Sequence, residues 1–207
     1  MKFWKILGTV GAFATLFGAC GSEEELKTCK ANSRFFNADI ECTCPNKTAT
    51  VTSMLDTGTM NFNSAGTSSA GVFVQSFKGG GRNAKEVALK IHKNLANVTL
   101  SKIEISIRKD CGGNPCSDPI VSGSLSGDAL TTTQIEHTIS LDDRRLLAYD
   151  VTYYLYMRFI DLNGQITFAS DNDTYEDGFA RWSNDTGETW TLREDVDFYF
   201  KILTCDD

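Results

Sequence analysis

The chain has 207 residues with 20 basic and 27 acidic side chains, which gives a formal net charge of −7. An acidic chain without a cluster of Lys and Arg is not expected to bind nucleic acid, because such binding requires neutralisation of phosphates. The length is sufficient for one domain with a substantial core.

Residues 1–20 have the layout of an export signal. Two lysines precede an apolar run over residues 6–19, and small residues stand directly before Cys20. The run is shorter than the roughly 20 apolar residues that a transmembrane helix needs. This layout resembles the signal peptide of bacterial lipoproteins, in which residues 1–19 are removed and Cys20 carries acyl chains such as palmitate. The resemblance implies a lipid anchor in the bacterial cell envelope, at the outer membrane; ordinary cleavage and an uncleaved anchor are the alternatives.

The residues from Cys20 onwards divide into three segments by composition. Residues 20–28 are polar and are expected to form a short tether. Residues 29–52 form a segment that carries three cysteines. Residues 53–207 are expected to form a single strand-rich domain.

Six cysteines follow Cys20. An even number of cysteines in an exported chain predicts three disulfide bonds. Cys111 and Cys116 flank a short Gly/Pro turn and are expected to pair, while the other four are expected to connect segment 29–52 to the last strand. A redox or metal role for Cys42 and Cys44 is the alternative, although the chain has only two histidines as further ligands. The six are Cys29, Cys42, Cys44, Cys111, Cys116 and Cys205.

Short strands are predicted along the domain because apolar residues alternate with polar ones. The pattern is clearest at residues 87–91 and 103–107. Residues 83–95 also fit helical spacing, so a helix is an alternative there. About ten strands without a repeated helical segment predict an all-β sandwich. The other predicted strands are 72–77, 120–125, 135–141, 151–159, 166–169, 179–183, 189–192 and 197–203.

Several of these segments resemble a jelly-roll module of bacterial surface and secreted proteins. They are Gln75–Phe77, Ile103–Arg108, Asp118–Leu125, Val151–Leu155, Trp182–Trp190 and Asp197–Phe198. The resemblance implies a jelly-roll β-sandwich, stapled by disulfides, that acts by binding and not as an enzyme. Its likeness in shape to carbohydrate-binding jelly rolls concerns the fold and does not identify a ligand.

Four aromatic residues are candidates for ligand binding. Trp182 and Trp190 lie symmetrically about Thr186, so a hairpin centred there would place them opposite each other on one face. With Tyr175 and Phe179 they would form a flat platform for sugar rings. Packing of the same rings in the core is the alternative.

An acidic stretch at residues 171–178 is a candidate metal site. Its carboxylates are of the type that binds calcium, and Asp171, Asp173 and Asp177 are the expected ligands. A solvated acidic turn is the alternative. No cofactor is expected apart from a possible structural calcium ion.

No enzyme motif is found in the sequence. Gly-x-Ser-x-Gly, His-Glu-x-x-His and the phosphate-binding loop are all absent. His92 and His137 are expected to be ordinary surface residues, and residues 142–145 a surface ion-pair cluster. The expected function is that of a lipid-anchored envelope module that binds a glycan or a surface protein. The alternatives are an assembly lipoprotein that docks to an envelope protein and, third, a glycoside hydrolase.

Overall fold

The computed structural model describes residues 29–31, 40–42, 47–53, 58–64, 71–171, 175–194 and 196–205. The chain divides into two compact units, residues 1–43 with residue 207, and residues 44–206. None of the described residues belongs to a helix that is long and apolar enough to cross a membrane. Cys20 and Cys44 lie outside the described residues.

The smaller unit contains one antiparallel pair of strands. β1 (Cys29–Ala31) pairs with β2 (Ile40–Cys42), and their register places Cys29 directly opposite Cys42. Two residues that face each other in an antiparallel pair have Cα atoms about 4.5 to 5.5 Å apart, a separation that a disulfide can bridge.

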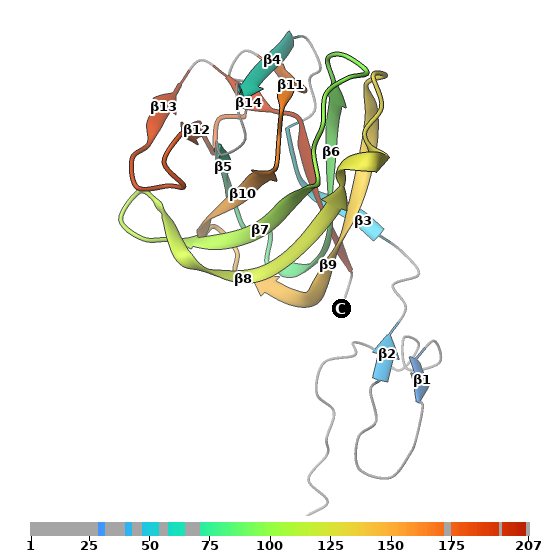
Figure 1. Ribbon diagram of the computed structural model, residues 1–207. Helices are drawn as coiled ribbons and strands as arrows, with labels where there is room; N and C mark the ends of the chain where they lie inside the picture. Colours follow the sequence, from blue (N-terminus) through green and yellow to red (C-terminus); the bar gives the residue numbers. More distant parts are fainter. Residues whose placement is uncertain are drawn as a thin grey trace, which may run out of the picture. The chain divides into compact units, whose positions relative to one another are not determined.

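The larger unit is a curled antiparallel sheet whose two halves pack face to face, so the predicted all-β sandwich is confirmed (Figure 1). The first half has the strand order β13-β12-β5-β10-β7-β8. Its strands are β5 (Val72–Lys78), β7 (Lys102–Asp110), β8 (Pro115–Ser126), β10 (Thr152–Ile160), β12 (Ala180–Ser183) and β13 (Thr191–Arg193).

The second half is built around β6, which pairs with β9 on one side and with β11 and β15 on the other. β3 pairs with β15, whereas β4 and β14 pair with β11. A short 3-10 turn, η2 (Gly127–Ala129), is the one helical element among the described residues. The strands are β3 (Lys47–Ser53), β4 (Gly58–Ser64), β6 (Arg82–Lys93), β9 (Ile135–Leu147), β11 (Gly164–Asp171), β14 (Asp197–Phe198) and β15 (Phe200–Cys205).

The two halves are joined where β8 meets β9. Gly123 pairs with Leu141 at this point. A Cβ atom at Gly123 would lie 2.4 Å from the carbonyl oxygen of Ser140. Only glycine therefore allows β8 to approach β9 this closely.

The core lies between the two halves and is rich in aromatic rings. The ring centroid of Phe73, in the first half, lies 5.6 Å from that of Phe168 and 5.5 Å from that of Phe198, both in the second half. The alternating residues Ile103, Ile105 and Ile107 are at most 1% exposed. Residues 82–93 are a strand, so the strand prediction is confirmed there and the helical alternative is wrong.

Some strands differ in extent from the prediction. β9 continues beyond Leu141 to Leu147 through four charged residues, because its backbone keeps pairing with β6 as far as Arg82. A strand predicted over 197–203 is interrupted at Tyr199, whose N–H donates to the carbonyl of Ala169 instead. β3 begins at residue 47 and pairs with β15, so the sheet starts earlier in the chain than the expected domain boundary at residue 53.

A buried polar contact connects the two halves near the middle of β5. Gln75 Nε2 donates to Asp197 Oδ1 at 2.7 Å, and Gln75 Oε1 accepts from the N–H of Phe198 at 3.1 Å. Asp197 Oδ2 accepts from the N–H of Tyr175 at 2.9 Å. Gln75 and Asp197 are both fully buried, so these bonds fix β14 and the segment that precedes β12.

Candidate functional site

The four aromatic residues predicted to bind a ligand lie on two opposite faces. Trp182 stands opposite Thr191 in the β12–β13 pair, so the predicted pairing of Trp182 with Trp190 is wrong. The hairpin is centred between Thr186 and Gly187, one residue away from an exact pairing of the two tryptophans. A shift of one residue moves a side chain to the other face of a sheet.

The turn between β12 and β13 is organised by one carboxylate. Asp185 Oδ1 accepts from Ser183 Oγ at 2.6 Å and from the N–H of Thr189 at 2.9 Å. These hydrogen bonds hold the pKa of Asp185 well below its ordinary value. Thr186 and Gly187 both have positive φ angles, which sets the register that sequence symmetry did not predict.

Two of the four aromatic residues pack against the main core. Trp182 and Tyr175 are partly buried against it. The Tyr175 ring lies 5.6 Å from the ring of Phe200, and its hydroxyl accepts from the N–H of Lys78 at 3.1 Å. Burial raises the pKa of Tyr175. These two residues therefore pack against the core, which was the alternative to ligand binding.

The other two lie on the outer face of the first half. Phe179 and Trp190 pack against a cluster formed by Tyr154, Tyr156 and two valines. Trp190 stands 6.4 Å from Tyr156 between ring centroids. A ligand-binding role for Phe179 and Trp190 stays a prediction.

The predicted calcium site falls partly outside the described residues. Asp173 is not among them, and Asp171 and Asp177 stand on either side of that gap. In the part of the chain that the structure describes, no group of three or more His, Cys, Asp or Glu side chains is placed to hold a metal ion. The calcium site therefore stays a prediction.

His137 is buried, so the prediction that it is a surface residue is wrong. It is 9% exposed and pairs with Leu89, a core residue, because its strand carries it on the inner face. Burial lowers the pKa of His137, and a hydrogen bond with the backbone of Ile91 opposes this shift. The ion-pair prediction is confirmed in part, since Arg145 Nη2 lies 3.0 Å from Asp143 Oδ2.

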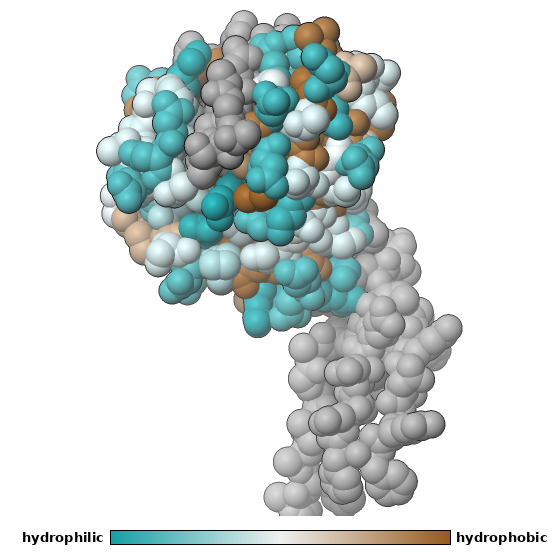
Figure 2. All heavy atoms as spheres, in the orientation of Figure 1, coloured by the Kyte–Doolittle hydropathy of each residue, from teal (hydrophilic) through white to brown (hydrophobic). Residues whose placement is uncertain are grey.

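A groove with a volume of about 410 Å³ runs over the outer face of β7, β8 and β10. This volume lies in the range of small-ligand sites, about 300 to 1,000 Å³. Figure 2 shows a surface that is mainly hydrophilic over these strands. We call it the serine groove; its lining includes Lys102, Glu104, Ser106, Arg108, Ser122, Ser124, Asp142, Tyr156 and Arg158.

The serine groove exists because small residues lie between larger ones. Register places Ser106 of β7 between Ser122 of β8 and Tyr156 of β10. In the same way it places Glu104 between Ser124 and Arg158. The serines form a low floor, and the longer side chains rise beside it. Successive side chains of a strand point to opposite faces of the sheet, so these alternate residues all point outward.

Arg108 is held in a fixed position on the groove. Its Nε donates to Ser106 Oγ and its Nη1 to the carbonyl of Cys116, both at 3.2 Å. Its guanidinium carbon lies 3.6 Å from the centre of the Tyr156 ring, a cation–π contact. Burial raises the pKa of Tyr156.

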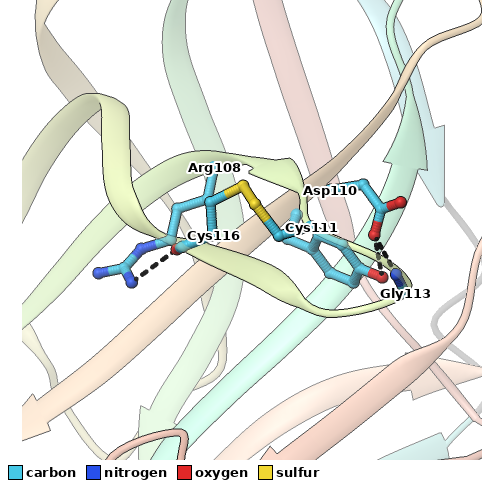
Figure 3. The surroundings of a disulfide bond; sticks show 6 residues. Arg108, Asp110, Cys111, Gly113 and Cys116 are labelled. Carbon is cyan, nitrogen blue, oxygen red and sulfur yellow. Dashed lines mark hydrogen bonds between the residues drawn. A yellow bond between two sulfur atoms is a disulfide. The ribbon is translucent and has the colours of Figure 1, made fainter.

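The disulfide loop beside the groove supports Arg108 (Figure 3). Cys111 and Cys116 form the predicted disulfide, with Cα atoms 5.1 Å apart. Asp110 Oδ1 accepts from the N–H of Gly113 at 2.8 Å and from the Tyr154 hydroxyl at 3.2 Å. The carbonyl that holds Arg108 therefore belongs to a loop that is closed covalently and tied to β10.

Three other charged residues of the groove, Lys102, Glu104 and Arg158, form a chain of contacts. Glu104 Oε1 lies 2.8 Å from Lys102 Nζ, and Glu104 Oε2 lies 3.8 Å from Arg158 Nη1. Arg158 Nε is buried and has no hydrogen-bond partner. The side chain of Arg158 as a whole is 41% exposed, so its outer end remains accessible from the groove.

Sequence reasoning missed the serine groove. One signal was present: Ser122, Ser124 and Ser126 occupy alternate positions of β8, which leaves one face of that strand without large side chains. Their alignment with Arg108 and Arg158 depends on strand register, which the sequence did not reveal. No protein-family model and no curated protein matches the chain.

Proposed function

We propose that this chain is a lipid-anchored binding protein of the bacterial cell envelope that recognises a glycan in the serine groove. The observation that carries the proposal is the groove itself, which is lined by hydroxyl, guanidinium and carboxylate groups around one aromatic ring. The lipid anchor on Cys20 rests on the resemblance of residues 1–20 to a lipoprotein signal.

The chemistry of the groove suits a ligand rich in hydroxyl groups. A sugar hydroxyl both donates and accepts hydrogen bonds. Ser122 and Ser124 can do both, Arg158 donates, and Asp142 accepts. β7, the middle strand of the groove, is paired along its length with β10 on one side and with β8 on the other, so it offers no open edge to a peptide strand.

The groove is held in shape before any ligand binds. Arg108 is fixed by two hydrogen bonds and by the Tyr156 ring. Glu104 is fixed by contacts with Lys102 and Arg158. Pre-formed side chains lower the entropy lost on binding, which favours recognition through few contacts.

Docking to an envelope protein is the second candidate function. Leu146, Tyr149 and Val151 at the β9–β10 turn are 59%, 80% and 45% exposed. Exposed apolar residues that gather in one region are typical of protein contacts. The partial burial of Trp182 and Trp190 also favours this candidate over an exposed sugar platform at those rings.

The proposal is for binding without catalysis. Glu104 and Asp142 are the two carboxylates of the groove, and a glycoside hydrolase needs one of its two to donate a proton. Glu104 already forms an ion pair with Lys102 and lies near Arg158, which favours a structural role for it. A glycan that is bound and recovered uncleaved after long incubation would support this part of the proposal.

The test is a glycan-array screen of the full chain in mild detergent, with a variant that fills the groove. Ser122→Phe places a ring on the floor and should abolish binding. Thr138→Phe is the matched control, because Thr138 is an exposed strand residue of β9 outside the groove. Absence of binding to any glycan, or equal binding by Ser122→Phe and the wild type, would contradict the proposal.

A further inference from the structure

We propose that the serine groove selects glycans that carry carboxylate groups, such as chains of uronic acids. This inference rests on the proposed function, because it specifies the class of ligand for the same groove. The balance of charge in the groove and the way in which its two arginines are held both favour such ligands.

The charge of the groove is opposite in sign to that of the chain. Its lining contains three cations, Lys102, Arg108 and Arg158, and two carboxylates, Glu104 and Asp142. The whole chain has a formal net charge of −7. A cationic groove in an acidic protein directs an anionic ligand to one place on its surface.

One carboxylate of the groove is shared between two cations. Lys102 and Arg158 both contact Glu104. A single negative charge cannot neutralise two positive ones, so a positive charge remains at this end. We expect the ligand carboxylate to lie beside Arg158, on the side of its guanidinium that faces away from Glu104.

Arg108 supplies a second positive group in a fixed position. The two hydrogen bonds that hold it go to uncharged oxygen atoms of Ser106 and Cys116. They fix the guanidinium without neutralising its charge. It covers the face of the Tyr156 ring, which is only 7% exposed, so the guanidinium and not the phenol ring faces a ligand in the groove.

Arg158 has an unused donor that a carboxylate can satisfy. Its Nε is buried without a partner, and a buried unpaired donor is costly. A small rotation of the guanidinium toward the groove would present Nε and one Nη side by side. A carboxylate accepts from these two groups in parallel, which a neutral hydroxyl cannot do.

The decisive experiment compares two ligands that differ only in charge. One probe is a uronic-acid oligosaccharide, and the other is the same oligosaccharide after reduction of its carboxyl groups to primary alcohols. Binding of each to the full chain in mild detergent is measured by calorimetry at low and at moderate salt. The acidic probe should bind at least ten-fold more tightly, and its affinity should fall as salt rises.

Two variants assign the effect to the groove. Arg158→Met should lower the affinity for the acidic probe at least ten-fold and change that for the reduced probe by less than three-fold. Lys109→Met removes the same charge from an exposed residue of the neighbouring strand β7 that does not line the groove, and it should leave both affinities nearly unchanged. Thermal unfolding of each variant checks that it is folded.

Each outcome has a distinct meaning. Equal affinity for the two probes, lost in Ser122→Phe, would overturn the preference for carboxylates and leave the proposed function standing. If neither probe binds and the glycan array shows no binding, both the preference for carboxylates and the proposed function are overturned. Binding of an acidic peptide in place of the acidic glycan would show that the cations of the groove serve a protein partner, and would overturn this inference.

Discussion

Replacing Gln75 by leucine should destabilise the protein strongly, although the two side chains have similar volumes. Gln75 donates to Asp197 and accepts from the N–H of Phe198 in a fully buried position. Leucine can do neither. The unpaired N–H costs about 1 to 3 kcal/mol, and the lost bond to the carboxylate costs about 1.5 to 3 kcal/mol. The apolar surface that leucine adds to the core offsets about 1 kcal/mol of this cost, so the free energy of unfolding should fall by about 1.5 to 5 kcal/mol.

The assay is equilibrium unfolding in urea, followed by tryptophan fluorescence. Gln165→Leu is the control, because Gln165 bonds to Asn94 in an exposed position and its loss should cost less than about 0.5 kcal/mol. A decrease below about 1 kcal/mol in Gln75→Leu would refute the reasoning, since it would mean that Asp197 and Phe198 find other partners at no cost.

Three further predictions concern a phenol, the anchor and the disulfides. Burial, and then the charge of Asp110, raise the pKa of Tyr154 to about 12 from 10.0; stability linked to this group is therefore complete below pH 10 and lost as the pH rises toward 12. Tyr154→Phe should remove the last step of an absorbance titration of the phenols, and an unchanged titration would contradict this. Cys20→Ala should release the protein from membranes in a fractionation experiment, whereas continued retention would count against the lipid anchor. Peptide mapping without reduction should recover Cys29 linked to Cys42, because they face each other in β1 and β2; recovery of Cys29 with any other cysteine would exclude this pairing.

Much of the fold follows from local sequence pattern. The alternation at residues 103–107 predicts a strand with one buried face, and the structure buries Ile103, Ile105 and Ile107. The spacing of Cys111 and Cys116 across a Gly/Pro turn predicts their disulfide. These predictions succeed because the interactions involved are close in sequence.

The features that failed depend on contacts distant in sequence or on exact register. β9 extends to Leu147 because β6 supplies its hydrogen bonds, not because its own residues alternate. The one-residue offset of the β12–β13 hairpin comes from the hydrogen bonds of Asp185. Gln75 and Asp197 lie 122 residues apart, so neither could be recognised as buried and paired.

The candidate site was missed for the same reason. The serine groove combines residues of four strands, β7, β8, β9 and β10, and none of its serines or arginines stands out in the sequence. The aromatic residues that did stand out are divided between the two faces of the sheet. Aromatic side chains serve core packing and ligand binding equally well, and only the register distinguishes the two uses.

The most direct test of the account is a crystal structure of the full chain with the glycan that binds it most tightly. The account predicts that the sugar lies over Ser122 and Ser124, within hydrogen-bonding distance of Arg158 and Arg108. A glycan bound at the β12–β13 turn or at the β9–β10 turn, with the serine groove empty, would contradict it.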